Sequence, residues 1–161
     1  MVFDLVVAIE VGVLLAAVLF MHRMSEVTSV EGWKDVDPEN DPDSIDLRVL
    51  SKHTIVYEIS GPMFFATADK ILQISPKEDT KALVLRMRSV STIDATAMRN
   101  LEILFENCKN RDVKLIMSHV NEQPMKVIQK AGFYGKVGEE NFCAHIDDAL
   151  ARAQDIVNAK A

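Results

Sequence analysis

Apolar side chains follow one another almost without a break at the start of the chain and become intermittent afterwards. The stretch Val11–Phe20 contains no polar side chain. A helix that spans a bilayer needs about 20 mostly apolar residues, and residues 1–24 reach that length. We therefore predict that residues 1–24 are the C-terminal part of a last transmembrane helix, and that the chain is a piece of a larger membrane protein.

Two acidic residues, Asp4 and Glu10, lie inside this apolar segment. Ionisable groups are costly in hydrocarbon and usually face a helix bundle or a water-filled path. Either the helix packs against other membrane helices, or it is a soluble helix with two solvated acids. His22 and Arg23 follow the apolar run, and basic residues at that flank favour the cytoplasmic side of a membrane.

Residues 25–44 are predicted to form an acidic linker. They carry seven acidic side chains against a single basic one, Lys34. Pro38 and Pro42 interrupt any regular structure. Charge runs are usually solvated, so a solvated tether is the simpler interpretation. An electrostatic contact with a basic partner, or with a Lys/Arg-rich membrane loop, is the alternative.

From Ile45 onwards, β-type segments alternate with amphipathic helical segments. We expect strands at Leu47–Leu50, Thr54–Ile59, Ala82–Met87, Val113–Ser118 and Asn141–Ile146. We expect helices at Phe64–Ile74, Asp94–Arg111, Pro124–Gly132 and Asp147–Ala159. This alternation implies parallel strand pairing with crossover helices, and a hairpin of the first two strands would add an antiparallel pair. Residues 45–161 are therefore predicted to be one α/β domain, a small mixed, mostly parallel sheet packed with helices.

Composition and motifs exclude several classes of function. The chain has 161 residues and a formal net charge of −6, which argues against nucleic-acid binding. Its two cysteines, Cys108 and Cys143, have no metal-type spacing. No Gly-rich phosphate loop follows a strand, and the four histidines are scattered without a nucleophile pattern. We therefore expect no catalytic residue, no metal and no tightly bound cofactor, so that the chain is not an enzyme.

One location could bind a small ligand, because ligands of open α/β sheets bind beyond the carboxyl ends of the strands. Arg86 and Arg88 lie two residues apart near the end of a predicted strand, so they project to the same face. The next helix begins near Asp94, and a helix N-terminus offers free N–H groups. One hypothesis is weak binding of a nucleotide or another anion by these three residues. The alternative is that both arginines are solvated and that Asp94 caps the helix.

Four stretches of the chain resemble segments of a known family. Ile59–Ala68, Leu83–Ala97 and Ala131–Phe133 are similar to segments of a STAS domain, and Phe3–Gly12 is similar to the final membrane helix of SulP anion transporters. The resemblance implies a domain on the cytoplasmic side of the inner membrane, attached to the transmembrane domain of a transporter for sulfate, bicarbonate or a related anion. It implies a role in regulation or assembly, with a cytosolic regulatory protein or a second copy of the chain as partner.

One position departs from the pattern of the stand-alone anti-sigma factor antagonists, which share the STAS domain. In those proteins a serine directly after the motif aspartate accepts a phosphate, and here Asp94 is followed by Ala95, which has no hydroxyl. Thr96 is the next residue, but one residue turns a helix by about 100°, so its side chain would point elsewhere. The departure favours a transporter domain over the alternative, a stand-alone signalling module.

Overall fold

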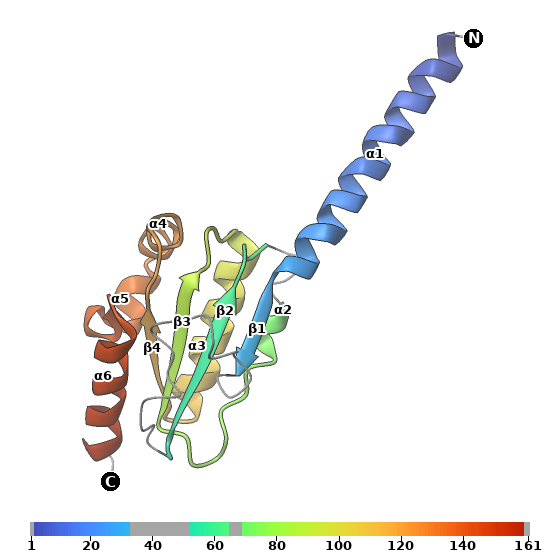
Figure 1. The fold of residues 1–161 in the computed structure, drawn as a ribbon. Helices are drawn as coiled ribbons and strands as arrows, with labels where there is room; N and C mark the ends of the chain where they lie inside the picture. The colour runs from blue at the N-terminus through green and yellow to red at the C-terminus, as the bar shows by residue number, and fades with distance from the viewer. Residues whose placement is uncertain (1, 33–51, 65–68, 160–161) are drawn as a thin grey trace.

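The computed structural model describes residues 2–32, 52–64 and 69–159, and Figure 1 shows how they are arranged. The helices are α1 (Val2–Val27), α2 (Asp69–Leu72), α3 (Ala95–Asn110), α4 (Glu122–Lys130), α5 (Phe133–Val137) and α6 (Ile146–Ala159), with a 3₁₀ turn, η4 (Glu139–Asn141). The strands are β1 (Ser29–Gly32), β2 (Thr54–Ser60), β3 (Ala82–Ser89), β4 (Lys114–Ser118) and β5 (Phe142–Cys143). From β2 onwards strands and helices alternate, as the periodicity of the sequence predicts.

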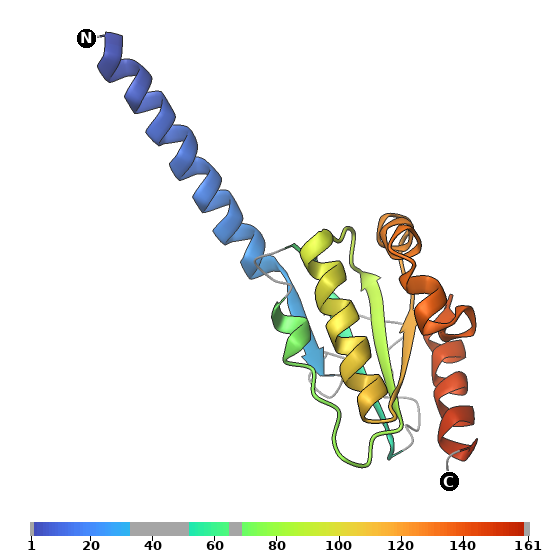
Figure 2. The ribbon, with the colours of Figure 1, turned by 180° about the vertical axis from the view of Figure 1, so that it is seen from behind.

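The strands form one five-stranded sheet in the order β1-β2-β3-β4-β5. Strands β2 to β5 pair in parallel, and β1 pairs with β2 in the antiparallel direction. Helix α3 covers one face of the sheet and α6 covers the other, as the two opposite views show (Figure 1 and Figure 2). The predicted fold class, a mixed and mostly parallel sheet packed with helices, is confirmed.

Strand β3 lies at the centre of the sheet and is buried on both faces. Leu83, Leu85 and Met87 belong to the core under α3, whereas Ala82 and Val84 belong to the core under α6, because successive side chains of a strand alternate between faces. None of these five side chains is exposed to solvent. This double burial explains why β3 reads as a continuous apolar run in the sequence.

The segment predicted as an acidic linker, residues 25–44, begins differently. Helix α1 continues to Val27, and Ser29–Gly32 form strand β1 along the free edge of β2. The four residues of β1 carry no strand signal of their own in the sequence. The strand is stabilised by its pairing with β2, because a strand depends on contacts with its neighbour in the sheet. The predicted hairpin strand Leu47–Leu50 lies outside the described residues, as do residues 33–44, and the antiparallel neighbour of β2 is β1.

The predicted helix Phe64–Ile74 is described only in part. Its helical residues are Asp69–Leu72, which form α2, and residues 65–68 lie outside the described residues. The remaining predicted helices correspond to α3, α4 and α6 within a few residues. The chain from Gly132 to Asn141 adds α5 and η4, which the sequence pattern does not predict.

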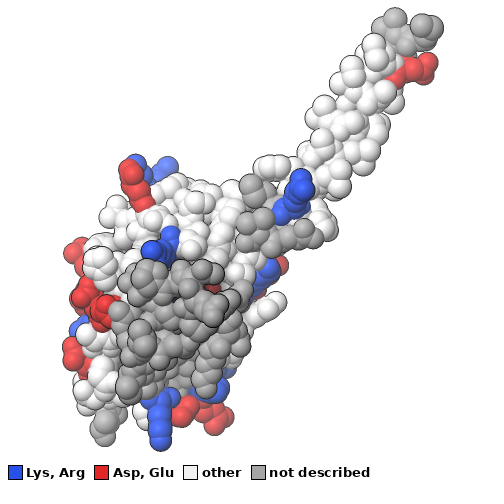
Figure 3. Space-filling view, in the orientation of Figure 1, with Lys and Arg blue, Asp and Glu red and all other residues white. Residues whose placement is uncertain are grey.

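Helix α1 projects away from the rest of the molecule (Figure 1). In the described part of the chain, its segment Asp4–Arg23 is the one stretch whose length and composition suit a membrane crossing, with a mean hydropathy of 2.4. Its 20 residues correspond to about 30 Å of helix, the thickness of a bilayer core. The face of α1 seen in Figure 3 is uncharged between its two ends, and this segment is not buried against the domain.

A buried ion pair joins β2 to β3. Glu58 and Arg86 are register partners in these parallel strands, and Arg86 Nη1 donates to Glu58 Oε2 at 2.9 Å. The Arg86 side chain is 1% exposed and that of Glu58 is 12% exposed. Removing one member of a buried pair leaves the other charge without its counter-ion in a site with little water, which is strongly destabilising.

We therefore predict that Arg86→Ala lowers the free energy of unfolding by about 3 kcal/mol. Urea unfolding of the chain in detergent, followed by alkylation of the buried Cys108, measures this loss, because that thiol becomes accessible when the domain opens. Arg88→Ala is the matched control, since Arg88 is exposed, and its effect should stay within about 0.5 kcal/mol. Equal unfolding midpoints for the two variants would contradict a stabilising role for the ion pair.

Candidate functional site

The candidate site lies where the parallel strands end. We call this region the carboxyl edge, formed by Ser60, Ser89, Ser118 and Cys143 with the loops that follow them. Since β1 runs antiparallel to β2, its first residue, Ser29, lies opposite Ser60. Helix α1 therefore joins the domain at the carboxyl edge, the edge at which ligands of α/β sheets usually bind. Figure 1 shows α1 leaving from the end of the sheet toward which β3 points.

The loop after β3 ends in a well-formed helix cap. Asp94 has an extended backbone, with φ −103° and ψ −177°, and its Oδ1 accepts from the Ala97 N–H at 2.8 Å. The Asp94 N–H donates to the carbonyl of Met63 at 3.2 Å, which ties the cap to the loop after β2. Ala95 and Thr96 follow in the first turn of α3, and both are exposed. The capping interpretation of Asp94 is thus correct.

Two amide side chains at the start of α4 hold the same loop. Asn121 Nδ2 donates to the carbonyl of Arg88 at 2.9 Å and to that of Val90 at 2.7 Å. Gln123 forms a two-way contact with Ile93, because its Oε1 accepts from the Ile93 N–H at 2.9 Å and its Nε2 donates to the Ile93 carbonyl at 3.2 Å. The loop between β3 and α3 is therefore fixed by side chains from a distant part of the chain.

The predicted anion-binding residues do not converge on one ligand position. Arg86 is buried and bonded to Glu58, so it belongs to the core of the sheet. Arg88 is exposed at the carboxyl edge, and Asp94 is engaged as the cap of α3. Alternation along β3 does place both arginines on one side of the strand, but the change from buried to exposed between them separates their environments. The spacing of residues in the sequence predicts the direction in which a strand side chain points, but it cannot predict whether that side chain is buried.

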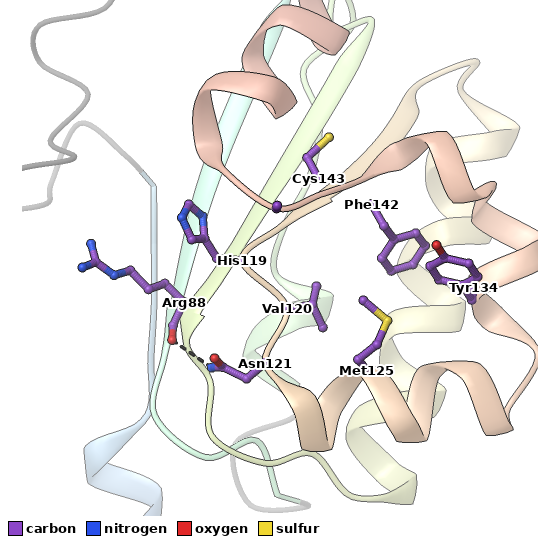
Figure 4. A pocket seen from close by; sticks show the side chains of 9 residues that line it. Arg88, His119, Val120, Asn121, Met125, Tyr134, Phe142 and Cys143 are labelled. Carbon is purple, nitrogen blue, oxygen red and sulfur yellow. Dashed lines mark hydrogen bonds between the residues drawn. The ribbon is translucent and has the colours of Figure 1, made fainter.

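The structure also shows a groove of about 490 Å³ at the carboxyl edge, which the sequence pattern does not predict. Its apolar wall comes from the loop after β4 and from α4, α5 and β5, which contribute Val120, Met125, Tyr134 and Phe142 in that order (Figure 4). The rings of Tyr134 and Phe142 lie 4.6 Å apart between centroids. Arg88, His119 and Asn121 also line the groove, and the side chain of Arg88 points away from the apolar wall in Figure 4. The position of the groove at the ends of parallel strands was the only signal that the sequence offered.

The cysteines are poor nucleophiles. Burial raises the pKa of the Cys108 thiol to about 11, and the nearby Arg111 opposes this rise only in part. Burial and the carboxylate of Asp148 raise the pKa of Cys143, against the opposing charge of Arg152. A thiol with a raised pKa holds little of the reactive thiolate form at neutral pH. Among the described residues, no cluster of three or more His, Cys, Asp or Glu side chains could hold a metal ion.

Comparison with protein families and curated proteins gives one consistent result. The STAS domain family matches residues 44–149. YvdB of Bacillus subtilis, a protein named for sulfate transport, is 31% identical over 91% of this chain. The bicarbonate transporter BicA of Picosynechococcus is 27% identical over 93% of this chain. The chain spans only 27% and 28% of the length of these two relatives.

Solved structures support the same relationship. A sulfate transporter family protein from Wolinella succinogenes shares 36% identity with a TM-score of 0.67, covering 74% of this chain and 99% of that one. The SulP transporter STAS domain from Vibrio cholerae shares 29% identity with a TM-score of 0.58, covering 69% of this chain and 88% of that one. An anti-sigma factor antagonist from Mycobacterium paratuberculosis, with 14% identity, a TM-score of 0.58 and coverage of 80% and 95%, shares the fold alone.

The two-way contact between Gln123 and Ile93 leads to a local prediction. Ile93 is 3% exposed, so Gln123→Ala leaves its N–H without the side-chain acceptor that the structure gives it. We expect the Ile93 amide to exchange with solvent about tenfold faster, the factor expected for losing one hydrogen bond of about 1.5 kcal/mol. Hydrogen exchange by NMR measures this rate. Gln129→Ala, on the exposed side of the same helix, is the control and should leave the Ile93 rate unchanged.

Proposed function

Because the chain belongs to the STAS domain family, we propose that it forms the cytoplasmic regulatory and assembly domain, with its preceding membrane helix, of a SulP-type secondary anion transporter. Sulfate and bicarbonate are the candidate anions, since the relatives are named for them. Transport itself would belong to the membrane domain of such a protein. The domain described here would act through protein contacts, without catalysis of its own.

The observation that carries this proposal is the way in which α1 meets the sheet. An uncovered apolar helix of membrane-spanning length runs into edge strand β1 with one residue between them. In a soluble protein, an exposed apolar surface of this size would favour association or aggregation. In a bilayer the same surface is satisfied by lipid and by neighbouring helices. The carboxyl edge then faces the cytoplasmic surface of the membrane.

The proposal assigns three kinds of partner. The transmembrane domain of the same transporter is the first, because α1 would be part of it. A cytosolic regulatory protein is the second, since the described domain offers exposed surface away from α1 (Figure 3). A second copy of the chain is the third, since an apolar helix in a membrane can pair with its like. The cytoplasmic membrane, with the domain in the cytoplasm, is the proposed location.

A stand-alone signalling module is the alternative function. The shared fold of the Mycobacterium antagonist is compatible with it. The residue at the phosphoacceptor position is Ala95, which cannot accept a phosphate, and this argues against the alternative. Mass spectrometry after incubation with a cognate kinase separates the two functions, because phosphorylation of neighbouring Thr96 would favour the signalling module and an unmodified protein would favour the transporter domain.

The membrane assignment of α1 makes a direct prediction. We expect the chain, expressed in bacterial cells, to stay in the membrane pellet after alkaline carbonate extraction. Leu14→Arg should release much of it, since a charge at the centre of a membrane helix costs about 2.5–3.5 kcal/mol on insertion scales. Ile103→Arg is the matched control, because Ile103 is a partly exposed apolar residue of α3, and it should leave the distribution unchanged.

The outcome that contradicts the proposal is a chain that carbonate extracts fully, or that remains dissolved as a monomer. The same membranes test orientation through a Gln129→Cys variant, because Gln129 is exposed on α4 whereas the two native thiols have raised pKa values. A maleimide that cannot cross membranes should label the introduced thiol in inside-out vesicles and leave it unlabelled in right-side-out vesicles. The reverse pattern would exclude a cytoplasmic domain.

A further inference from the structure

The connection between α1 and the sheet consists of one buried residue. Thr28 lies between the last residue of α1 and the first residue of β1, and it is 1% exposed. Its hydroxyl donates to the carbonyl of Pro62 at 2.7 Å, and its own carbonyl accepts from Lys70 Nζ at 2.5 Å. The hydroxyl and the carbonyl of Thr28 are thus bonded to the loop after β2 and to α2, which ties the end of α1 to the domain.

The first of these bonds leads to the N-terminus of α3. Pro62 is followed by Met63, which is 1% exposed and forms an isolated parallel bridge with Ile93. The Met63 N–H donates to the carbonyl of Thr92 at 2.9 Å, and the Met63 carbonyl accepts from the Asp94 N–H at 3.2 Å. Asp94 is the cap of α3. The Thr28 hydroxyl and the backbone hydrogen bonds of Met63 therefore connect the residue after α1 to the cap of α3.

The second bond reaches α3 by a separate path. Lys70 belongs to α2, where its neighbour Asp69 accepts through Oδ1 from Asn100 Nδ2 at 3.2 Å. Asn100 lies in the second turn of α3 and is 5% exposed. Two independent contacts of Thr28 thus end in the first two turns of the same helix. The exposed pair Ala95 and Thr96 lies between these two end points in the sequence.

We propose that Thr28 and Lys70 transmit changes in the tilt of α1 to the first turn of α3. The inference rests on the proposed function, in which α1 spans a membrane. A buried hydroxyl or carbonyl that loses its partner is left without water to replace it, so a modest change in tilt moves the bonded partners rather than separating them. The joint then works as a conformational device that links the membrane helix to the exposed surface at Ala95 and Thr96.

The test varies the tilt of α1 through the thickness of the bilayer, because a helix longer than the local hydrocarbon thickness tilts to remain inside it. The full chain is placed in thin dimyristoyl and in thicker dioleoyl phosphatidylcholine bilayers. Oriented circular dichroism measures the tilt of α1, and hydrogen exchange measures protection of residues 93–98. We expect exchange in this segment to differ about fivefold between the two lipids, about the effect of weakening one ordinary hydrogen bond.

Two variants identify the carriers of this effect. Thr28→Val removes the hydroxyl donor, and Lys70→Met removes the ammonium donor. Because the two contacts reach α3 by separate paths, each variant should lose about half of the dependence on lipid. Thr28→Ser, which keeps the hydroxyl, should retain it. Lys126→Met is the matched control, since Lys126 is an exposed lysine whose partner, Glu122, lies in its own helix. If Thr28→Val fails to fold, Lys70→Met alone decides the result.

The outcomes separate coupling from a merely structural joint. A structural joint would make the variants exchange faster by the same factor in both lipids, and that result would overturn the proposal. A tilt that changes while the wild-type exchange stays constant would overturn it as well. Failure of α1 to enter either bilayer would instead contradict the proposed function, so the two failures are distinguishable.

Discussion

The antiparallel pairing of β1 with β2 is the constraint on which the rest of this structure depends. Because Ser29 pairs opposite Ser60, the end of α1 is fixed at the carboxyl edge of a sheet whose other strands are parallel. With parallel pairing, β1 would begin at the opposite edge and α1 would leave the domain there. One choice of strand direction therefore sets the edge of the domain from which α1 leaves, and it places the start of α3 at that same edge.

The interior of the sheet explains how the strands that end at the carboxyl edge are held in place. β3 is covered on both faces by apolar side chains, and the Glu58–Arg86 pair fixes the register of β2 and β3 near the ends of these strands. A buried ion pair is weak evidence for net stability, but losing either partner is costly because the remaining charge would lie there without its counter-ion. After the end of β3, hydrogen bonds from the side chains of Asn121 and Gln123 hold the loop that leads to Asp94.

The start of α3 is the surface at which the transporter interpretation and the signalling interpretation of this chain differ. The fold shared with the antagonist shows that the scaffold is common to the two. In this chain the exposed helix start carries Ala95, and a covalent switch at that residue is chemically excluded. The proposed input comes through the covalent chain itself, from α1 through Thr28. In this proposal a membrane helix would control the surface at Ala95 and Thr96 without any covalent modification.

The sequence by itself determined the membrane-length helix, the order of strands and helices after β2, the cap at Asp94 and the family, because each depends on local periodicity or on residues close together in the chain. It did not determine β1, since four residues carry no strand signal without β2 beside them. It placed Arg86 and Arg88 on one face but could not tell the buried arginine from the exposed one, because burial depends on Glu58 and on covering elements far away in sequence. The joint at Thr28 and the clamp by Asn121 and Gln123 bring together residues about 30 or more positions apart. Such contacts are fixed by packing, and only the tertiary structure decides them.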